Sequence, residues 1–493
     1  MTMETLLNHI WGSWIPATSG ELLDQRDPAD LRSITCRFQR SSRTDAVSAI
    51  EAAAAAFPSW SALPCARRGD ILLRAVELMR ERRELIAGTI VAENGKTMRE
   101  AQGEVEAAIR EMAWQVAEGL RLPGEMTPSA HPGVLAYAVR RPLGVVSVIC
   151  PWNFPFNVPA RKCTPALMAG NTVVFKPASL TPSSGAWFVR ILQEAGLPPG
   201  VLNLITGDGG TVGDELVRHP LIRAVSFTGS TPVGLGIQRA AAGGLVKTQL
   251  EMGGKNAIIV LDDAQLDLAA EATVLGAFAC AGQWCTSTSR AIVQRGVLEA
   301  FTQRVLALAS RLTLGRGSDP RTGMGPVCGR AQLEGITAAM LSARQEGARL
   351  RLGGRQLLDG EMSQGCFIEP TVFSDVTPGM RVASEEIFGP VLAVLAVDDF
   401  EQAVTVSNQV PFGLCSSIYT ASLSQAMRFI ERSEVGMAHV NLPTSMKEPQ
   451  MPFGGIKHSG FGTPEAGRSG IEFFTRHQVA YIRHSPESPP GTR

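Results

Sequence analysis

The sequence lacks the features that mark several classes of protein. Lys and Arg number 46, as do Asp and Glu, so the net charge is zero and no basic excess is available to bind nucleic acid. No apolar run approaches the roughly 18 residues of a membrane span. Residues 1–14 show no charged start followed by an apolar core, so we expect no secretion signal.

Cysteine and histidine are sparse and dispersed. The nine cysteines are never spaced as Cys-x-x-Cys, and the seven histidines never form His-Glu-x-x-His. These absences argue against a disulfide framework and against a zinc site. The sequence therefore predicts a protein of the reducing cytoplasm without a bound metal.

The order of periodic segments predicts an α/β fold. With 493 residues, the chain exceeds the size at which one hydrophobic core stops growing, so two or more domains are expected. Residues 43–118 are predicted to be helical, with Thr44 and Asp45 as caps, and the charges that alternate from Pro64 onward predict a solvated face. Two series of β-rich runs alternating with helices follow and indicate two Rossmann-like parallel sheets: 145–149, 172–175, 201–205, 224–227 and 247–250, then 257–261, 291–294, 391–396, 415–419 and 437–440.

Two segments fit neither sheet. Residues 127–141 and 472–483 are extended and partly apolar, and such strands at the periphery need a partner edge. The Pro/Ser-rich tail 485–493 is predicted to be disordered.

Three short runs carry candidate chemistry. Cys285 ends Gly282-Gln-Trp-Cys285, Glu251 lies in Gln249-Leu-Glu251-Met-Gly-Gly, and Asn153 lies in Cys150-Pro-Trp-Asn153-Phe-Pro. A thiol, a carboxylate and an amide are the groups needed to oxidise an aldehyde through a thioester. Alone, each is weak evidence, because a single cysteine is most often a core residue, which is our interpretation of Cys280, and a single glutamate is most often solvated.

Together with four further runs, these motifs resemble the aldehyde dehydrogenase superfamily over nearly the whole chain. The further runs are Phe175-Lys-Pro-Ala-Ser179, Ser226-Phe-Thr-Gly-Ser230-Thr-Pro-Val-Gly234, Glu385-Glu-Ile-Phe388-Gly-Pro and Pro452-Phe-Gly-Gly-Ile-Lys-His-Ser-Gly460. The resemblance implies an NAD(P)-binding domain at 1–122 and 142–252 and a catalytic domain at 253–440. It also implies an oligomerisation arm at 123–141 and 471–485, which should pair subunits in a homodimer or homotetramer.

The resemblance also implies a role for each catalytic residue. Cys285 is the nucleophile, and Asn153 with the Cys285 N–H forms the oxyanion hole, although Asn153 could instead organise its proline turn. Glu251 is the base that hydrolyses the thioester, and Lys162 completes the catalytic set. Because members that pass the acyl group to coenzyme A typically lack this glutamate, Glu251 favours release of a free acid. A non-catalytic scaffold of this fold should have lost Cys285 or Glu251.

The expected cofactor is NADP or NAD. The run from Gly229 and Ser230 to Gly234 joins a strand to a helix and should offer free N–H groups to a pyrophosphate. Ser179 stands where NAD-preferring relatives carry Glu, so NADP should be accepted, unless Ser179 merely fills a loop. The other cofactor residues that the resemblance implies are Trp152, Lys176, Pro177, Ala178, Gly209, Met252, Glu386 and Phe388. Without its motif, Glu386 would be taken for a surface acid.

The substrate prediction depends on Arg161. It lies in an expected helix, 154–169. Succinic semialdehyde dehydrogenases carry Arg at this position to hold the carboxylate of the substrate. Trp284, next to Cys285, should narrow the substrate tunnel. Residues 441–449 and 462–468 look more like α-ketoglutarate semialdehyde (2,5-dioxopentanoate) dehydrogenases. We therefore expect an ω-carboxylated aldehyde: succinic, glutaric or α-ketoglutaric semialdehyde. Ala279 replaces a second arginine of the succinic enzymes, and Lys447 is a candidate second cation. The alternatives are an internal salt bridge of Arg161 and a broad-range enzyme for neutral aliphatic or aromatic aldehydes.

Overall fold

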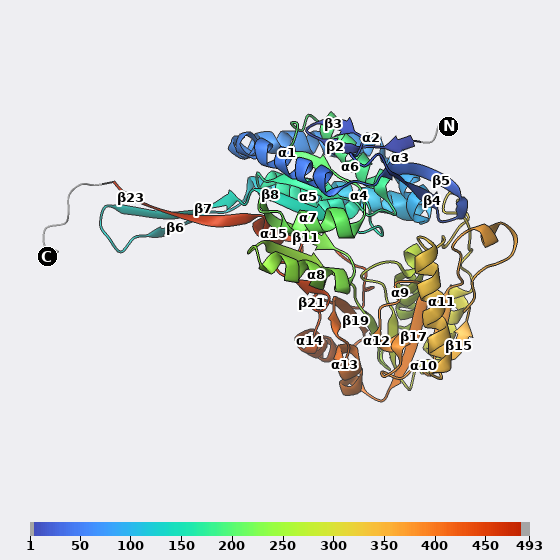
Figure 1. The fold of residues 1–493 in the computed structure, drawn as a ribbon. Coiled ribbons are helices and arrows are strands. Elements are labelled where there is room, and N and C mark those ends of the chain that lie inside the picture. Colours follow the sequence, from blue (N-terminus) through green and yellow to red (C-terminus); the bar gives the residue numbers. More distant parts are fainter. Residues whose placement is uncertain (1–3, 485–493) are drawn as a thin grey trace.

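The computed structural model describes residues 4–484. Two α/β units lie side by side, one on an eight-stranded and one on a seven-stranded sheet, and a long β-arm projects from the first unit (Figure 1). The predicted fold, with two Rossmann-like sheets and an arm, is confirmed. The tail 485–493 lies outside the described residues, and the domain boundaries stay predictions.

The first sheet has five parallel strands at its centre. Its order is β22-β12-β11-β8-β9-β10-β2-β3. All five predicted runs are strands of this sheet, whereas the short antiparallel edge strands escaped prediction because two or three residues show no period. The bounds are β2 (Asn8–Ile10), β3 (Ser13–Ile15), β8 (Val145–Ile149), β9 (Thr172–Lys176), β10 (Leu202–Leu204), β11 (Ile222–Thr228), β12 (Lys247–Glu251) and β22 (Gly460–Phe461).

Both faces of this sheet are covered by helices. Val146 and Val148 of β8 pack in one apolar core, while Val145 packs in the other, because successive residues of a strand point to opposite faces. Strands that are apolar at every position are typical of such a buried parallel sheet. The surrounding helices are α1 (Arg43–Ala62), α2 (Cys65–Glu81), α3 (Arg83–Asn94), α4 (Met98–Leu120), α5 (Asn157–Met168), α6 (Pro182–Glu194), η1 (Gly209–Gly213), α7 (Asp214–Arg218) and α8 (Thr231–Ala242).

Residues 43–118 are helical as predicted, but one cap was assigned wrongly. Ser42, not Thr44 or Asp45, caps α1: its Oγ accepts the N–H of Asp45, and the Asp45 carboxylate accepts the N–H of Ser42. Asp45 is therefore the third helical residue of a capping box. Pro64 directly precedes α2, as expected.

The second sheet has the order β15-β16-β17-β14-β13-β19-β20. All five predicted runs are strands, and β15 and β16, of four residues each, were missed. No helix within residues 4–484 is long and apolar enough to cross a membrane. The bounds are β13 (Ala257–Val260), α9 (Leu266–Phe278), η2 (Ala279–Gly282), β14 (Arg290–Gln294), α10 (Leu298–Ala309), α11 (Arg330–Gln345), β15 (Arg349–Leu352), η3 (Gly360–Gln364), β16 (Thr371–Ser374), α12 (Arg381–Ser384), β17 (Val391–Val397), α13 (Phe400–Asn408), β19 (Cys415–Tyr419), α14 (Leu423–Arg432) and β20 (Met437–Val440).

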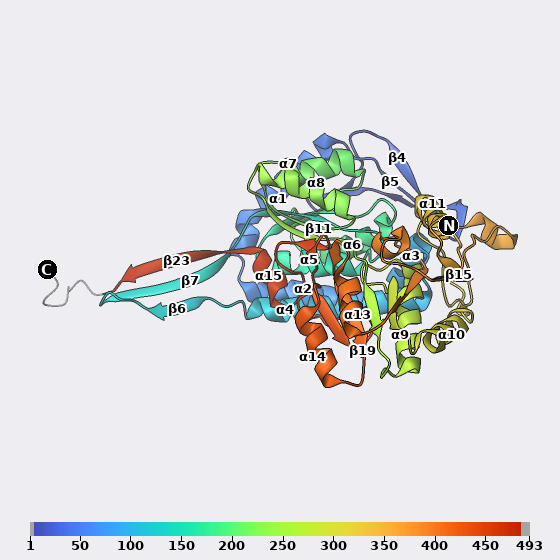
Figure 2. The same ribbon diagram turned by 90° about the horizontal axis from the view of Figure 1, so that it is seen from below.

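The arm is a three-stranded antiparallel sheet (Figure 2). Its central strand β7 (Val134–Pro142) pairs with β6 (Glu125–Pro128) on one side and with β23 (Thr475–Arg483), which follows α15 (Gly467–Phe473), on the other. The two peripheral segments, expected to pair between subunits, thus pair within one chain. Met126 and Tyr481 on the arm remain 75% and 74% exposed.

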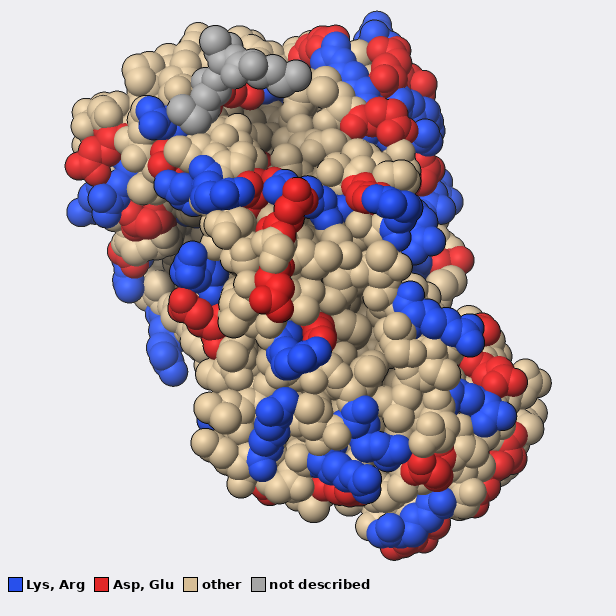
Figure 3. All heavy atoms as spheres, turned by 90° about the vertical axis from the view of Figure 1, so that its right-hand side faces the viewer, with Lys and Arg blue, Asp and Glu red and all other residues tan. Residues whose placement is uncertain are grey.

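Two small sheets complete the fold. One joins β1 (Glu4–Leu6), β5 (Asp30–Gln39) and β4 (Leu22–Asp27), and the other joins β18 (Phe412–Gly413) to β21 (Ile456–Lys457). Basic and acidic side chains lie interspersed on the face shown in Figure 3, which matches the net charge of zero.

Candidate active site

Two cavities meet at Cys285. One has a volume of about 640 Å³ and the other about 190 Å³, and Cys285, Asn153 and Met252 line both. One thiol can therefore face two ligands, each in its own cavity. The larger cavity is also lined by Glu251, Arg161, Trp284 and Lys447, and the smaller by Trp152, Gly229, Ser230, Glu386 and Phe388.

The chain turns sharply before it reaches Cys285. Cys280 and Ala281 have φ values of 50° and 53°, in the left-handed region that non-glycine residues rarely adopt and that is enriched at functional sites. Cys280 is buried, as expected of a core cysteine. Burial raises the pKa of the partly exposed Cys285 thiol to about 11, and the positive charges of Lys447 and Arg161 oppose this shift.

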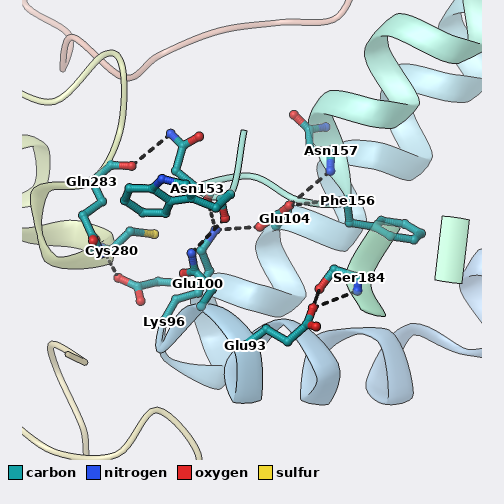
Figure 4. A network of polar contacts seen from close by, with 12 residues as sticks. Glu93, Lys96, Glu100, Glu104, Asn153, Phe156, Asn157, Ser184, Cys280 and Gln283 are labelled. Atoms are coloured by element: carbon teal, nitrogen blue, oxygen red, sulfur yellow. Dashed lines mark hydrogen bonds and ion pairs between the residues drawn. The ribbon is translucent and has the colours of Figure 1, made fainter. Parts of the chain in front are cut away.

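Asn153 is held from two sides (Figure 4). Its Nδ2 donates to the carbonyl of Gln283 at 3.0 Å, on the loop that carries Cys285. The backbone carbonyl of Asn153 accepts a hydrogen bond from Lys96 Nζ at 2.7 Å, and Lys96 Nζ forms an ion pair with Glu104 at 2.6 Å. The amide group has two hydrogens, so one remains for an oxyanion formed next to Cys285.

Glu251 ends β12 and is 4% exposed. Its Oε2 has no hydrogen-bond partner among the described residues. Burial raises the pKa of this carboxyl well above its ordinary value, and the nearby Glu465 adds to the shift while Lys162 opposes it. A buried carboxyl with one free oxygen, facing the same cavity as the thiol, is suited to act as a general base.

Lys162 belongs to a buried cluster near Glu251. Its Nζ donates to Ser226 Oγ at 3.0 Å and forms an ion pair with Glu465. The sequence prediction missed Glu465, which lies within the run 462–468 that was used only to predict the substrate class.

The predicted cofactor residues follow the carboxyl ends of neighbouring parallel strands, where ligands of such sheets bind. Ser179 Oγ donates to the carbonyl of Gly207 at 3.2 Å, so it does help to close a loop. Burial lowers the pKa of Lys176 to about 8. The residues are Trp152 after β8, Lys176, Pro177, Ala178 and Ser179 at the end of β9, Gly209 after β10, Gly229 and Ser230 after β11, and Met252 after β12.

The two glycines of the predicted phosphate turn are packing positions. The Gly229 N–H donates to the carbonyl of Glu251 at 3.0 Å, so the N–H groups expected to face a pyrophosphate are those that follow Gly229 at the start of α8, and this contact stays a prediction. At Gly234, a Cβ atom would lie 2.4 Å from Met252 Sδ, so only glycine allows α8 to approach this segment. Ser230 is the N-cap residue of α8, and its side chain makes no capping hydrogen bond; anions bind at helix N-termini of this kind.

The smaller cavity has a fixed acidic wall. Glu386 Oε1 accepts the Gly254 N–H at 3.0 Å, and burial raises the pKa of Glu386 to about 7. A Cβ at Gly253 would collide with this carboxylate. Phe388 meets Trp152 edge to face, with 5.3 Å between ring centroids. Glu386 is thus part of the cavity and not a free surface acid.

Arg161 lines the larger cavity from α5, which spans residues 157–168 and not the expected 154–169. Its guanidinium donates to Asn157 Oδ1 at 3.0 Å and lies 3.7 Å from Glu111 and 3.6 Å from Glu465. Arg161 therefore has internal ion pairs, but neither is within hydrogen-bonding distance, and its Nε has no partner among the described residues. The Trp284 and Phe154 rings both line this cavity, with 5.5 Å between their centroids.

One helix contributes a row of glutamates to this region. Glu100, Glu104, Glu111 and Glu118 of α4 follow one another at steps of four, seven and seven residues, which keeps them on one helix face. Glu100 accepts the Cys280 N–H at 2.7 Å, and Glu104 accepts the N–H groups of Phe156 and Asn157 that begin α5. Sequence reasoning did not find these residues.

Known proteins agree with this geometry. Residues 14–480 match the aldehyde dehydrogenase family. The chain is 41% identical to the α-ketoglutaric semialdehyde dehydrogenase of Bacillus subtilis, over 97% of this chain and 98% of that protein. It superimposes on an NADP-dependent enzyme of E. coli (34% identity, 97% and 98% coverage, TM-score 0.94) and on betaine aldehyde dehydrogenase from Staphylococcus aureus in complex with NAD+ (30%, 98% and 95%, TM-score 0.95). The chain belongs to the aldehyde dehydrogenase family.

Proposed function

We propose that this enzyme oxidises an ω-carboxylated semialdehyde to the free acid, with α-ketoglutaric semialdehyde as the first candidate. The observation that carries the proposal is Arg161, a buried guanidinium in the same cavity as Cys285. A buried cation is costly unless paired, and a carboxylate is its natural bidentate partner. The name of the Bacillus subtilis relative supports the same substrate class.

The reaction begins with Cys285. The thiol first releases its proton to solvent; the thiolate then attacks the aldehyde carbon, a C–S bond forms, and the carbonyl oxygen becomes an oxyanion to which Asn153 Nδ2 and the Cys285 N–H donate. One such donor contributes about 3–4 kcal/mol to transition-state stability. Loss of hydride leaves a thioester on Cys285. Glu251 then removes a proton from water, the resulting hydroxide attacks the thioester, and the C–S bond breaks to release the acid.

The smaller cavity fits a nicotinamide cofactor. Glu386, held by the Gly254 N–H, would bind the ribose, and Trp152 and Phe388 would flank the ring. When bound, the oxidised nicotinamide supplies the hydride acceptor. The cofactor is NADP or NAD; Ser179 and Lys176, without a carboxylate at position 179, support use of NADP.

A broad-range enzyme for neutral aldehydes is the second candidate. Glu111 and Glu465 already lie within 4 Å of Arg161, and apolar residues such as Val158 and Phe278 line much of the cavity.

We further propose that the protein forms a homodimer or homotetramer, which the exposed apolar residues of the arm support. We propose the cytoplasm as its location, because the nine free cysteines would stay reduced there.

The test compares an acidic with a neutral substrate. NAD(P)H absorbance gives kcat/KM for succinic semialdehyde and butanal in wild type, Arg161→Leu and the charge-conserving control Arg161→Lys. We expect Arg161→Leu to lose at least tenfold in preference for the acid and Arg161→Lys to lose less. If Arg161→Leu keeps the wild-type preference, Arg161 is structural and the semialdehyde proposal fails.

A further inference from the structure

Lys447 reaches the larger cavity from a loop distant in sequence. The loop is exposed, but the Lys447 Nζ points inward, 5.6 Å from the ring centroid of Phe154 and 5.8 Å from that of Phe453. It donates to Asn157 Oδ1 at 3.2 Å, the same oxygen that accepts from Arg161. The two cations therefore lie on one side of the cavity and share an acceptor.

The cations around this acceptor are not all paired with a carboxylate. Arg161, Lys162 and Lys447 are cationic, whereas Glu111 and Glu465 supply the carboxylates paired with Arg161 and Lys162. Glu104 pairs with Lys96. Within residues 4–484, no carboxylate lies within 4.0 Å of Lys447 Nζ. Glu251 lines the same cavity but forms no ion pair with these cations, so Lys447 is the cation of this cluster without a carboxylate partner among the described residues.

We propose that Lys447 is a second substrate-binding cation that selects 2-oxo acids. Arg161 would bind the carboxylate through its planar fork, while Lys447, a compact donor with three N–H bonds, would bind the 2-oxo oxygen beside it. This inference rests on the proposed function. It implies that the enzyme prefers a 2-oxo acid semialdehyde over an ω-carboxylated aldehyde of the same length.

A matched set of five-carbon aldehydes tests this assignment. α-Ketoglutaric and glutaric semialdehyde differ only in the 2-oxo group, and pentanal lacks the carboxylate as well. Each is measured with wild type, with Lys447→Met and with Glu448→Gln, an exposed neighbour on the same loop. Lys447→Met should lower the preference for α-ketoglutaric over glutaric semialdehyde at least about tenfold, through KM, and preserve the preference for glutaric semialdehyde over pentanal. Glu448→Gln should keep both preferences.

The outcomes separate this inference from the proposed function. Equal losses of kcat/KM for both acids in Lys447→Met would mean that Lys447 binds the carboxylate, and no loss for either acid would mean that it binds neither group; each overturns the inference. Arg161→Leu, tested with glutaric semialdehyde and pentanal, decides the proposed function independently, because neither of those substrates carries the 2-oxo group.

Discussion

The Nζ of Lys96 donates to the backbone carbonyl of Asn153 over 2.7 Å. Lys96 also forms a fully buried ion pair with Glu104, which in turn accepts two N–H groups at the start of α5. The backbone that presents the candidate oxyanion donor is therefore fixed by a charged pair outside the reacting groups.

Breaking this pair should destabilise the fold and slow the reaction. Lys96→Met leaves the Glu104 charge unpaired in the interior, which costs about 3–5 kcal/mol. The double variant Lys96→Met/Glu104→Gln should be more stable than Lys96→Met alone, as urea unfolding would reveal. Arg381→Met, at the exposed pair with Glu385, is the control and should have little effect. Equal stability of Lys96→Met and wild type would show that the Lys96–Glu104 ion pair does not stabilise this part of the fold.

The nucleophile and the base should give different kinetic defects. Cys285→Ala should abolish oxidation and still bind cofactor. Glu251→Gln should release about one NAD(P)H per site in a burst and then stall at the thioester. Stopped-flow absorbance measures both, with Cys366→Ala, at a buried cysteine elsewhere, as the control. Full steady turnover by Cys285→Ala would contradict the assignment of Cys285 as the nucleophile.

Thioester hydrolysis should depend on pH through Glu251. Burial raises the pKa of this carboxyl well above its ordinary value, and only the ionised form accepts a proton from water. The deacylation rate should therefore rise as pH rises through the raised pKa. For stability the sign is opposite: the folded state favours the protonated carboxyl, so stability present at low pH is lost as pH rises through that pKa. A deacylation rate independent of pH in wild type would contradict this role.

Cofactor choice should respond to charge at position 179. Ser179→Glu places a carboxylate beside the expected 2′-phosphate, and two like charges ~4 Å apart repel by about 1–4 kcal/mol. The NADP/NAD ratio of kcat/KM should fall at least about fivefold. Ser179→Gln, with the same size but no charge, is the matched control. An unchanged ratio in Ser179→Glu would support a role for Ser179 in loop closure alone.

The arm should hold subunits together. Met126, Val479 and Tyr481 are more than half exposed on a sheet whose outer strands pair only inward within residues 4–484, and such edges favour association. Light scattering should give the mass of a dimer or tetramer. The double variant Val479→Lys/Tyr481→Lys should weaken the association of the subunits. A stable wild-type monomer at micromolar concentration would contradict this expectation.

Features formed by residues close together in the sequence could be predicted, whereas contacts between residues far apart in the sequence could not. The central strands were predicted because most of them are short runs rich in Val, Ile and Leu bounded by Gly or Pro, and Cys285, Glu251 and Asn153 were singled out because each lies in a short run that resembles a family motif. Glu465 was not found, since its ion-pair partner Lys162 lies 303 residues away and such a pair leaves no periodic pattern. Glu104 and Glu111 were missed for a similar reason: in a helix sequence, a buried glutamate looks the same as a solvated one.

The row of glutamates on α4 limits how this protein can change through evolution. Each of the four meets a different part of the enzyme: Glu100 the turn that leads to Cys285, Glu104 the start of α5, Glu111 the buried Arg161, and Glu118 the C-terminal Arg468. Deleting one residue between Glu104 and Glu111 would rotate the rest of the helix by about 100° and turn the last two contacts away together. Substitutions can accumulate on the solvent face of α4, whereas insertions and deletions are confined to the loops outside it.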